Sequence, residues 1–313
     1  MDVFITGATG FIGSAVAHQF RQQGHNVTAL AHSPESARQL EQRGHQSVAG
    51  SLFEPAGWQS HAENADVIVH AAHVRPGRRL SAGWLRQSTL ARDTALQALI
   101  EAAERGGRCQ ALIYTSGIVA HGDHGENWTD ETEAPTRTSA LGDYHLDGER
   151  QVREAAGERS LPAMSLRPGM VYGNGGTFAN HFLAVARKGS FQYPGSGENF
   201  LSFIHVDDLA RAYVAAAERP QAGKVISVVD NSPIRMKHMA QTLVSGFGGH
   251  KVSSVPHWLV ALFAGRALAD MLVGSYRVSN RLAREQLDWE PRHPEFETQI
   301  EHVIQEFQAA PAK

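Results

Sequence analysis

The chain has 313 residues, of which 42% are hydrophobic and 19% are charged, and its formal net charge at pH 7 is −3. This length allows one large α/β domain or a nucleotide-binding domain with a smaller partner. The 29 basic residues form no long block that would neutralise a phosphate backbone, so we expect no nucleic-acid partner. No apolar run approaches the roughly 18 residues that a membrane helix needs, so we expect no membrane partner either.

The chain start and the cysteine content indicate a cellular compartment. Met1-Asp2-Val3 carries no positively charged leader and enters a strand pattern at once, so we expect no signal peptide. A single cysteine, Cys109, excludes an internal disulfide framework. Both features favour the cytoplasm. For assembly, symmetry base rates make a homodimer the default expectation.

Strand-like apolar runs alternate with helix-length amphipathic stretches in the first half of the chain. This rhythm predicts βαβ units and a parallel sheet. The expected strands are 2–6, 26–31, 46–50, 66–71, 110–115 and 162–167, and the expected helices are 11–23, 34–43, 84–105 and 140–156. The predicted fold class is therefore α/β, a Rossmann-type doubly wound parallel sheet over residues 1–168.

The regular alternation of strands and helices ends near residue 168, and beyond it glycine-rich loops separate helical segments. We expect helices near 178–188 and 207–218 and a mostly helical stretch over 235–309. Residues 169–313 are thus predicted to form a smaller, mostly helical substrate-binding lobe, with some chain returning to the Rossmann domain. The apolar stretch 257–272 predicts packing in a core or a dimer; a substrate-pocket wall or a membrane-surface contact is the alternative.

A glycine-rich turn follows the first expected strand and opens the first expected helix. Its sequence is Thr6-Gly7-Ala8-Thr9-Gly10-Phe11-Ile12-Gly13. Gly7 permits a tight turn, Gly10 lets the backbone approach a pyrophosphate, and Gly13 allows close helix–strand packing. The helix N-terminus adds N–H donors and a positive dipole end. The turn therefore predicts a dinucleotide site.

The end of the second expected strand bears on the choice between NAD and NADP. An acidic residue there would bond the ribose hydroxyls of NAD, but this chain has Ala31-His32-Ser33. His32 and Ser33 can instead accept a 2′-phosphate, with Arg38 as a counter-charge, which favours NADP while leaving NAD possible. The alternative is that Ser33 only caps the next helix and Arg38 is a solvated side chain.

Several segments together resemble one family over nearly the whole chain. They are the turn Thr6–Gly13, Asp66-Val67-Ile68-Val69-His70-Ala71-Ala72, Leu112-Ile113-Tyr114-Thr115-Ser116-Gly117, Arg167-Pro168-Gly169-Met170-Val171-Tyr172-Gly173, Phe203-Ile204-His205-Val206-Asp207-Asp208-Leu209-Ala210, Ser279-Asn280-Arg281-Leu282 and Leu287-Asp288-Trp289-Glu290-Pro291. These segments resemble the extended short-chain dehydrogenase/reductases, also called the NAD-dependent epimerase/dehydratase superfamily.

The resemblance implies a set of cofactor contacts along the first half of the chain. One departure is Ser51, where the family usually has an aspartate near the adenine. The implied contacts are Gly7, Thr9, Gly10, Phe11, Ile12, Gly13, Ser51, Leu52, Ala71, Ala72, His73, Thr115, Pro168, Gly169 and Val171.

The larger departure concerns the Tyr-x-x-x-Lys pair that family members normally use to move a proton. The lysine lowers the pKa of the tyrosine, which is otherwise near 10. This chain has five lysines, and the first is Lys188, beyond the helix where the pair belongs. Alignment on Gly148-Glu149-Arg150 puts Leu141 at the tyrosine position and His145 at the lysine position. If the register is instead set on Tyr144, the lysine position holds Gly148, which cannot act. The chain therefore resembles the atypical members that lack the pair.

Two interpretations of the catalytic residues follow. In the first, Tyr144 supplies the proton while His145 and Ser116 assist. In the second, the acid or base lies in the loop His121-Gly122-Asp123-His124. The spacing of that loop and the lack of a third ligand do not support a metal site, so we expect no metal.

The sequence leaves three functions open. The first is an NAD(P)(H)-dependent oxidoreductase acting on a carbonyl or alcohol of a small metabolite, since hydride chemistry belongs largely to the cofactor. The second is a nucleotide-sugar epimerase or dehydratase, which needs a strong base. The third is a cofactor-binding sensor without turnover.

Overall fold

The computed structural model describes residues 1–75 and 79–310. Its centre is a seven-stranded sheet in the order β11-β6-β5-β4-β1-β2-β3, with every neighbouring pair parallel. The strands are β1 (Asp2–Thr6), β2 (Asn26–Ala31), β3 (Gln46–Ala49), β4 (Val67–His70), β5 (Ala111–Thr115), β6 (Ala163–Pro168) and β11 (Val225–Val228). The fold is thus a Rossmann-type α/β fold, as predicted.

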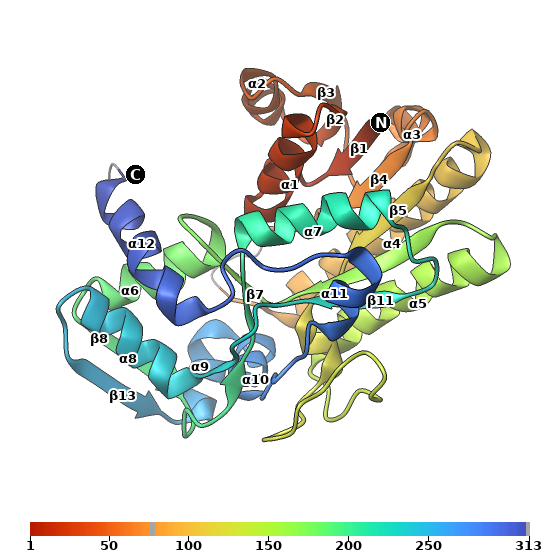
Figure 1. Cartoon of the computed structure of the whole chain (residues 1–313). Helices are drawn as coiled ribbons and strands as arrows, with labels where there is room; N and C mark the ends of the chain where they lie inside the picture. The colour runs from red at the N-terminus through yellow and green to blue at the C-terminus, as the bar shows by residue number, and fades with distance from the viewer. Residues whose placement is uncertain (76–78, 311–313) are drawn as a thin grey trace.

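Helices cover both faces of this sheet (Figure 1). One apolar cluster packs α1 and α7 against one face, and another packs α3, α4 and α5 against the other. The helical elements of this part are α1 (Phe11–Gln22), α2 (Pro34–Gln42), η1 (Pro55–Gly57), α3 (Gln59–Glu63), α4 (Ala82–Gly106), η2 (Ile118–His121), α5 (Ala140–Glu158) and α7 (Val206–Glu218).

The strand order reverses between β1 and β4, where connections leave in opposite directions. In open α/β sheets, ligands bind at such a switch point, beyond the carboxyl ends of the strands. The glycine turn after β1 and the residues after β4 lie at that edge of the sheet. The topology alone therefore places the site at the predicted turn.

All six predicted strands are confirmed to within one residue at each end, but the seventh, β11, was not predicted. Val225–Val228 is only four residues long and pairs with β6. A short apolar run is ambiguous in sequence even between turn residues such as Gly223 and Pro233, and here its partner strand decides its conformation. Together with α7, it brings chain from beyond residue 168 back to the Rossmann sheet.

The remaining chain forms a second lobe with its own apolar cluster. The expected helix at 178–188 is a π-helix continued by one short α-turn, and a strand within 235–309, β13, pairs with β8 and was missed. The elements are β7 (Met170–Tyr172), η3 (Phe178–Leu183), α6 (Ala184–Ala186), β8 (Ser190–Pro194), β9 (Phe200–Leu201), β10 (Phe203–His205), β12 (Ile234–Arg235), α8 (Met236–Gly246), β13 (Lys251–Val255), α9 (His257–Ala264), α10 (Arg266–Val273), α11 (Arg281–Leu287) and α12 (Phe296–Ala309).

The apolar stretch 257–272 forms α9 and α10. The expectation that it packs in the core is wrong for α9, which has no buried residue, and Trp258 and Phe263 are 65% and 70% exposed. The two helices pack mainly on each other and line a cavity with the start of α5. Among the described residues, no helix is long and apolar enough to cross a membrane.

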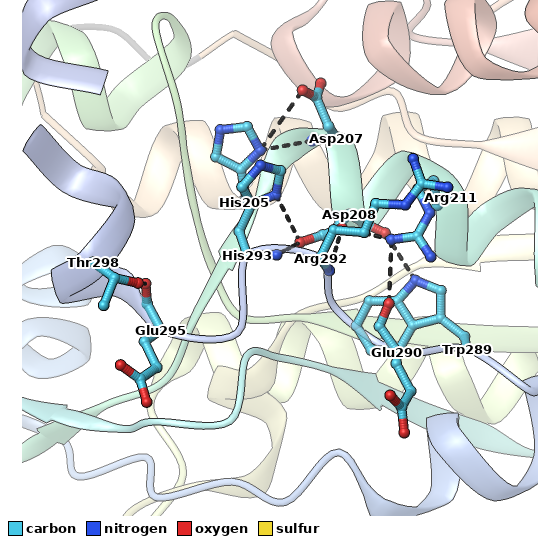
Figure 2. A network of polar contacts seen from close by, with 10 residues as sticks. All are labelled: His205, Asp207, Asp208, Arg211, Trp289, Glu290, Arg292, His293, Glu295 and Thr298. Atoms are coloured by element: carbon cyan, nitrogen blue, oxygen red, sulfur yellow. Dashed lines mark hydrogen bonds and ion pairs between the residues drawn. The ribbon is translucent and has the colours of Figure 1, made fainter. Parts of the chain in front are cut away.

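A buried carboxylate ties the C-terminal segment to α7 (Figure 2). Asp208 is fully buried, and its oxygens accept hydrogen bonds from the backbone N–H groups of Arg292 and His293 at 2.9 and 2.7 Å. The Asp208 carbonyl also accepts from the indole N–H of Trp289 at 3.1 Å. Because unpaired buried charge is costly, this network fixes the segment against the Rossmann domain.

Candidate active site at the carboxyl edge of the sheet

The glycine turn has the close approaches that its sequence predicts. Gly7 adopts φ +87°, a conformation that favours glycine, and a Cβ there would lie 2.7 Å from the backbone of Ala71. A Cβ at Gly13 would lie 2.2 Å from the carbonyl oxygen of Gly7. These approaches bring the turn, the start of α1 and the segment after β4 together.

The first turn of α1 is arranged as an anion site. Gly10 is the N-cap residue, makes no side-chain cap and donates from its N–H to the Gly7 carbonyl at 2.9 Å. The following N–H groups, at Phe11, Ile12 and Gly13, therefore have no capping side chain, and the first turn has no acidic residue. Open N–H donors and the helix dipole fit a pyrophosphate, so the residues present match the predicted dinucleotide.

The predicted adenine-end residues lie after β2 and β3. Ser33 caps α2 by accepting from the Ser36 N–H at 3.1 Å, and the Ser36 hydroxyl lies 3.2 Å from Nδ1 of His32. Arg38 is exposed, one turn into α2. Ser51 and Leu52 follow β3, whose end is joined to β2 by a hydrogen bond from Gly50 to Ala31.

The predicted nicotinamide-end residues lie after β4, β5 and β6. The Thr115 hydroxyl is 2.6 Å from the Tyr213 hydroxyl of α7. Gly169 fits closely under the second lobe, since a Cβ there would lie 2.8 Å from the Ser202 carbonyl oxygen. Ala71, Ala72 and His73 follow β4, Pro168 ends β6, and Val171 lies in β7.

Ser116 belongs to a buried polar network. Its hydroxyl donates to Glu149 of α5 at 2.6 Å, and Glu149 also holds the guanidinium of Arg167 through two bonds of 2.7 Å. Glu149 is fully buried and Arg167 is 5% exposed. This network clamps α5 to the ends of β5 and β6.

The loop histidine His121 is part of the same network. Its Nε2 lies 2.9 Å from the Ser227 hydroxyl, and Arg167 Nη1 lies 3.2 Å from its Nδ1. Burial, reinforced by the Arg167 charge, lowers the pKa of His121 to about 3. His124 contacts the His121 carbonyl at 3.0 Å, and Asp123 accepts from the Gly125 N–H at 2.9 Å. These contacts give the loop side chains structural partners.

Over residues 1–75 and 79–310, no three His, Cys, Asp or Glu side chains form a group suited to a metal ion.

Tyr144 and His145 lie together in the first turns of α5, with ring centroids 5.1 Å apart. Burial raises the pKa of Tyr144 to about 12, so its hydroxyl stays protonated at neutral pH. The Tyr144 ring is covered by the guanidinium of Arg92 from α4, whose carbon lies 4.5 Å from the ring centroid. Tyr144 is therefore held between two helices.

His145 lies against the end of β5. A Cβ on Gly117 would lie 3.2 Å from its Nε2, so the glycine makes room for the imidazole. Its Nδ1 is buried and has no hydrogen-bond partner among the described residues. Burial, with smaller contributions from the charges of Arg92, His73 and Arg167, lowers its pKa to about 3. His145 is therefore a neutral imidazole at the cofactor edge.

A cavity of about 370 Å³ opens beside the first turn of α5. Its wall comes from the loop before α5 and from α9, α10 and the segment after them. The lining residues are Asp123, Arg137, Thr138, Ser139, His257, Arg266, Asp270, Val273, Gly274 and Tyr276.

Sequence reasoning missed three residues of this site: Arg92, Gly117 and Glu149. The position of Arg92 could have been noticed in the sequence, since a charged residue at helical spacing from Ser88, Leu96 and Leu99 falls on the apolar face of α4. Glu149 entered only as an alignment marker. Gly117 gave no signal, because only the folded chain shows which side chain lies over it.

The fold and the glycine turn together define a dinucleotide-binding protein of the extended short-chain dehydrogenase/reductase type. Residues 3–229 match the sequence profile of the NAD dependent epimerase/dehydratase family. The chain belongs to that family, as the resemblance implied.

Individual relatives cover nearly the whole chain. A 3-diazoavenalumate denitrifying reductase of Streptomyces sp is 29% identical over 309 residues, which cover 94% of this chain and 97% of that protein. A 4-hydroxy-2-methyl-3-oxo-4-farnesyl-3,4-dihydroquinoline-1-oxide ketoreductase of Stigmatella aurantiaca is 25% identical over 252 residues, covering 79% and 74% of the two chains. The human epimerase family protein SDR39U1, solved with NADPH, superposes with a TM-score of 0.81 at 24% identity, covering 97% and 99%.

Proposed function

We propose that the chain is an NAD(P)(H)-dependent oxidoreductase acting on a carbonyl or alcohol of a small metabolite. The family assignment and the reductase names of two relatives support this class. The observation that carries the proposal is the neutral imidazole of His145 at the carboxyl edge of the sheet, beside a complete dinucleotide turn. When bound, the nicotinamide supplies or accepts the hydride.

The chain's own residues then have to orient the substrate and stabilise charge on its oxygen. We assign the imidazole hydrogen to Nε2, because Nδ1 is enclosed without an acceptor. From Nε2, His145 donates a hydrogen bond to the substrate oxygen as negative charge develops there, and solvent provides the proton. A pKa of about 3 keeps this donor neutral at physiological pH.

Ser116 and Tyr144 are proposed to position His145 and the strand end beside it, not to exchange protons with the substrate. The Ser116 hydroxyl is held by Glu149 and fixes the strand end that leads to Gly117. Tyr144 packs beside the His145 ring and keeps its orientation. The cavity between the start of α5 and α9–α10 is the proposed place of the substrate, because it is lined by Ser139, the N-cap residue of the helix that carries Tyr144 and His145.

The activity is tested by supplying NADPH with a panel of aldehydes and ketones and following nicotinamide absorbance. With a substrate in hand, His145→Phe is expected to lower kcat about 100-fold, the usual effect of losing one oxyanion donor, while the NADPH dissociation constant stays within a factor of about three. His302→Gln, at an exposed position of α12, is the control and is expected to leave kcat unchanged.

Two outcomes contradict the proposal. Absence of turnover over the whole panel, with NADPH binding confirmed by fluorescence, favours the sensor. Retention of UDP-glucose in calorimetry, without carbonyl reduction, favours the nucleotide-sugar epimerase or dehydratase.

We further propose that the cofactor is NADP(H). No carboxylate stands at the end of β2, Ala31-His32-Ser33, and the nearest one is Glu35 in the first turn of α2. His32 and Ser33 precede α2 and Arg38 lies one turn into it, where a 2′-phosphate would be received. The human relative solved with NADPH supports this choice. NADPH is expected to bind more tightly than NADH. Arg38→Ala is expected to weaken NADPH about tenfold, the worth of one charge-assisted hydrogen bond, and to leave NADH unchanged.

Arg43→Ala is the matched control for that measurement. Arg43 is also exposed and lies just beyond the last turn of α2, away from the β2 end. Its removal is expected to leave both dissociation constants unchanged in fluorescence titrations. NADH binding tighter than NADPH, insensitive to Arg38→Ala, would show that Ser33 is only a helix cap.

A further inference from the structure

The buried face of α4 carries one charged side chain, Arg92, which has no role in the proposed reaction described above. Arg92 is 2% exposed in a helix whose other buried residues are Ser88 and a row of alanine, leucine and isoleucine side chains. A guanidinium stays charged under all physiological conditions, so its burial is expensive unless it is paired. The contacts that pair Arg92 therefore decide what this buried charge does.

The hydrogen bonds of Arg92 cross from α4 to α5. Nη1 donates to the carbonyl oxygen of Tyr144, while Nε and Nη2 donate to Asp93 at 2.9 and 2.7 Å. Asp93 also accepts from Gln151 of α5 at 2.7 Å. The guanidinium plane covers the Tyr144 ring, a favourable cation–π arrangement. Arg92 thus holds the turn of α5 that carries Tyr144 and His145.

The charge of Arg92 is also not cancelled inside the protein. Its only ionic partner among the described residues, Asp93, has 42% of its side chain exposed, so solvent screens that carboxylate more than it screens the guanidinium. Within the protein, the charge of Arg92 acts to lower the pKa values of four neighbouring groups: Tyr144 and His145 of α5, Tyr114 of β5 and His70 of β4. The charge of Arg92 therefore reaches ionisable groups on α5, β5 and β4.

The position of this charge matters because α5 has no lysine. A Tyr-x-x-x-Lys pair would place an ammonium on α5 itself, and in this chain the lysine position holds the neutral His145. We propose that Arg92 is the positioning residue of this site: it holds from α4 the turn of α5 that carries Tyr144 and His145, and it supplies there the fixed positive charge that α5 lacks. This charge adds to the burial of His145 in opposing a proton on its imidazole. The inference rests on the oxidoreductase function proposed above.

The groups that face His145 come from four elements. Tyr144 belongs to its own helix, Arg92 to α4, His73 to the loop after β4 and Arg167 to β6. The three basic groups all oppose a proton on the imidazole, and Arg92 contributes most among them. Both arginines have a carboxylate partner, but Glu149 beside Arg167 is fully buried, whereas Asp93 beside Arg92 is 42% exposed and screened by solvent. Removal of Arg92 is therefore expected to change the field at His145 the most.

The test is a proton NMR titration of the His145 ring in the full-length protein, which needs no substrate. In the wild type, the imidazole is expected to stay neutral down to pH 5. Arg92→Gln removes the charge and is expected to raise the pKa of His145 by about one unit or more. Arg92→Lys keeps the charge and is expected to restore a low pKa, although it loses the planar contact with Tyr144.

Arg105→Gln, an exposed arginine of the same helix, is the control and is expected to change nothing. An unchanged His145 pKa in Arg92→Gln would overturn the proposal and leave Arg92 a purely structural residue. If Arg92→Gln does not fold, a wild-type His145 that titrates near 6.5 would overturn it equally. A shifted pKa without turnover on any carbonyl would retain the role of Arg92 and reject only the oxidoreductase function.

Discussion

Gly13→Ala is expected to weaken NADPH binding by about 100-fold. Its Cβ would lie 2.2 Å from the carbonyl oxygen of Gly7, so α1 has to move away from β1. Overpacking against a fixed backbone costs up to about 3 kcal/mol, and a loss of that size in binding corresponds to roughly 100-fold. The displaced N–H groups are the ones proposed to bind the pyrophosphate, so we expect the substitution to weaken binding. Fluorescence titration with NADPH measures this loss.

Gly157→Ala is the matched control. Gly157 lies on the exposed side of α5, and a Cβ there would have no neighbour within 4 Å. Replacing glycine by alanine inside an exposed helix stabilises it by up to about 1 kcal/mol. We expect a small rise in Tm and an unchanged NADPH dissociation constant. Wild-type affinity in Gly13→Ala would mean that the helix start does not bind the pyrophosphate.

Glu149→Ala is expected to lower the free energy of unfolding by about 3–5 kcal/mol. The substitution leaves the guanidinium of Arg167 buried without its carboxylate partner, and breaking a buried pair in this way has costs of that size. It also removes the acceptor of the Ser116 hydroxyl. Urea unfolding followed by circular dichroism measures the loss. The ends of β5 and β6 are then expected to exchange their amide hydrogens faster.

Glu154→Ala on the same helix is the comparison. Glu154 pairs with Arg150 at 3.2 Å, but both side chains are about half exposed, and such surface pairs contribute little. Its expected cost is at most about 0.5 kcal/mol. Equal effects of the two substitutions would contradict the view that the Glu149 network clamps α5 to the sheet.

Much of the fold could be predicted from local patterns. Strands such as Asp2–Thr6 and Asn26–Ala31 were located because buried parallel strands are apolar runs bounded by turns. The glycine turn specified its own geometry, since only glycine tolerates the positive φ of Gly7 and the contact at Gly13. Those features depend on residues that are neighbours in sequence.

Elements of the second lobe were harder to predict. Lys251–Val255 is a strand because Ser190–Pro194 lies beside it, and the two segments are about sixty positions apart in the sequence. The exposed α9 likewise has an apolar sequence typical of a buried helix, and only the folded chain shows that it lies at the surface, packed mainly on α10. Pairing and burial of this kind depend on distant parts of the chain.

The candidate catalytic site also combines features set by residues close in sequence with features set by distant parts of the chain. From the sequence, a dinucleotide is predicted to bind at the first turn, the usual lysine is absent from the helix after β5, and one alignment register puts His145 in its position. Only the tertiary structure decided that Gly117 lies under the imidazole and that Arg92, from another helix, brings a positive charge to α5. Sequence patterns report contacts within one turn or one strand, whereas the charge at this site depends on how two helices pack against each other.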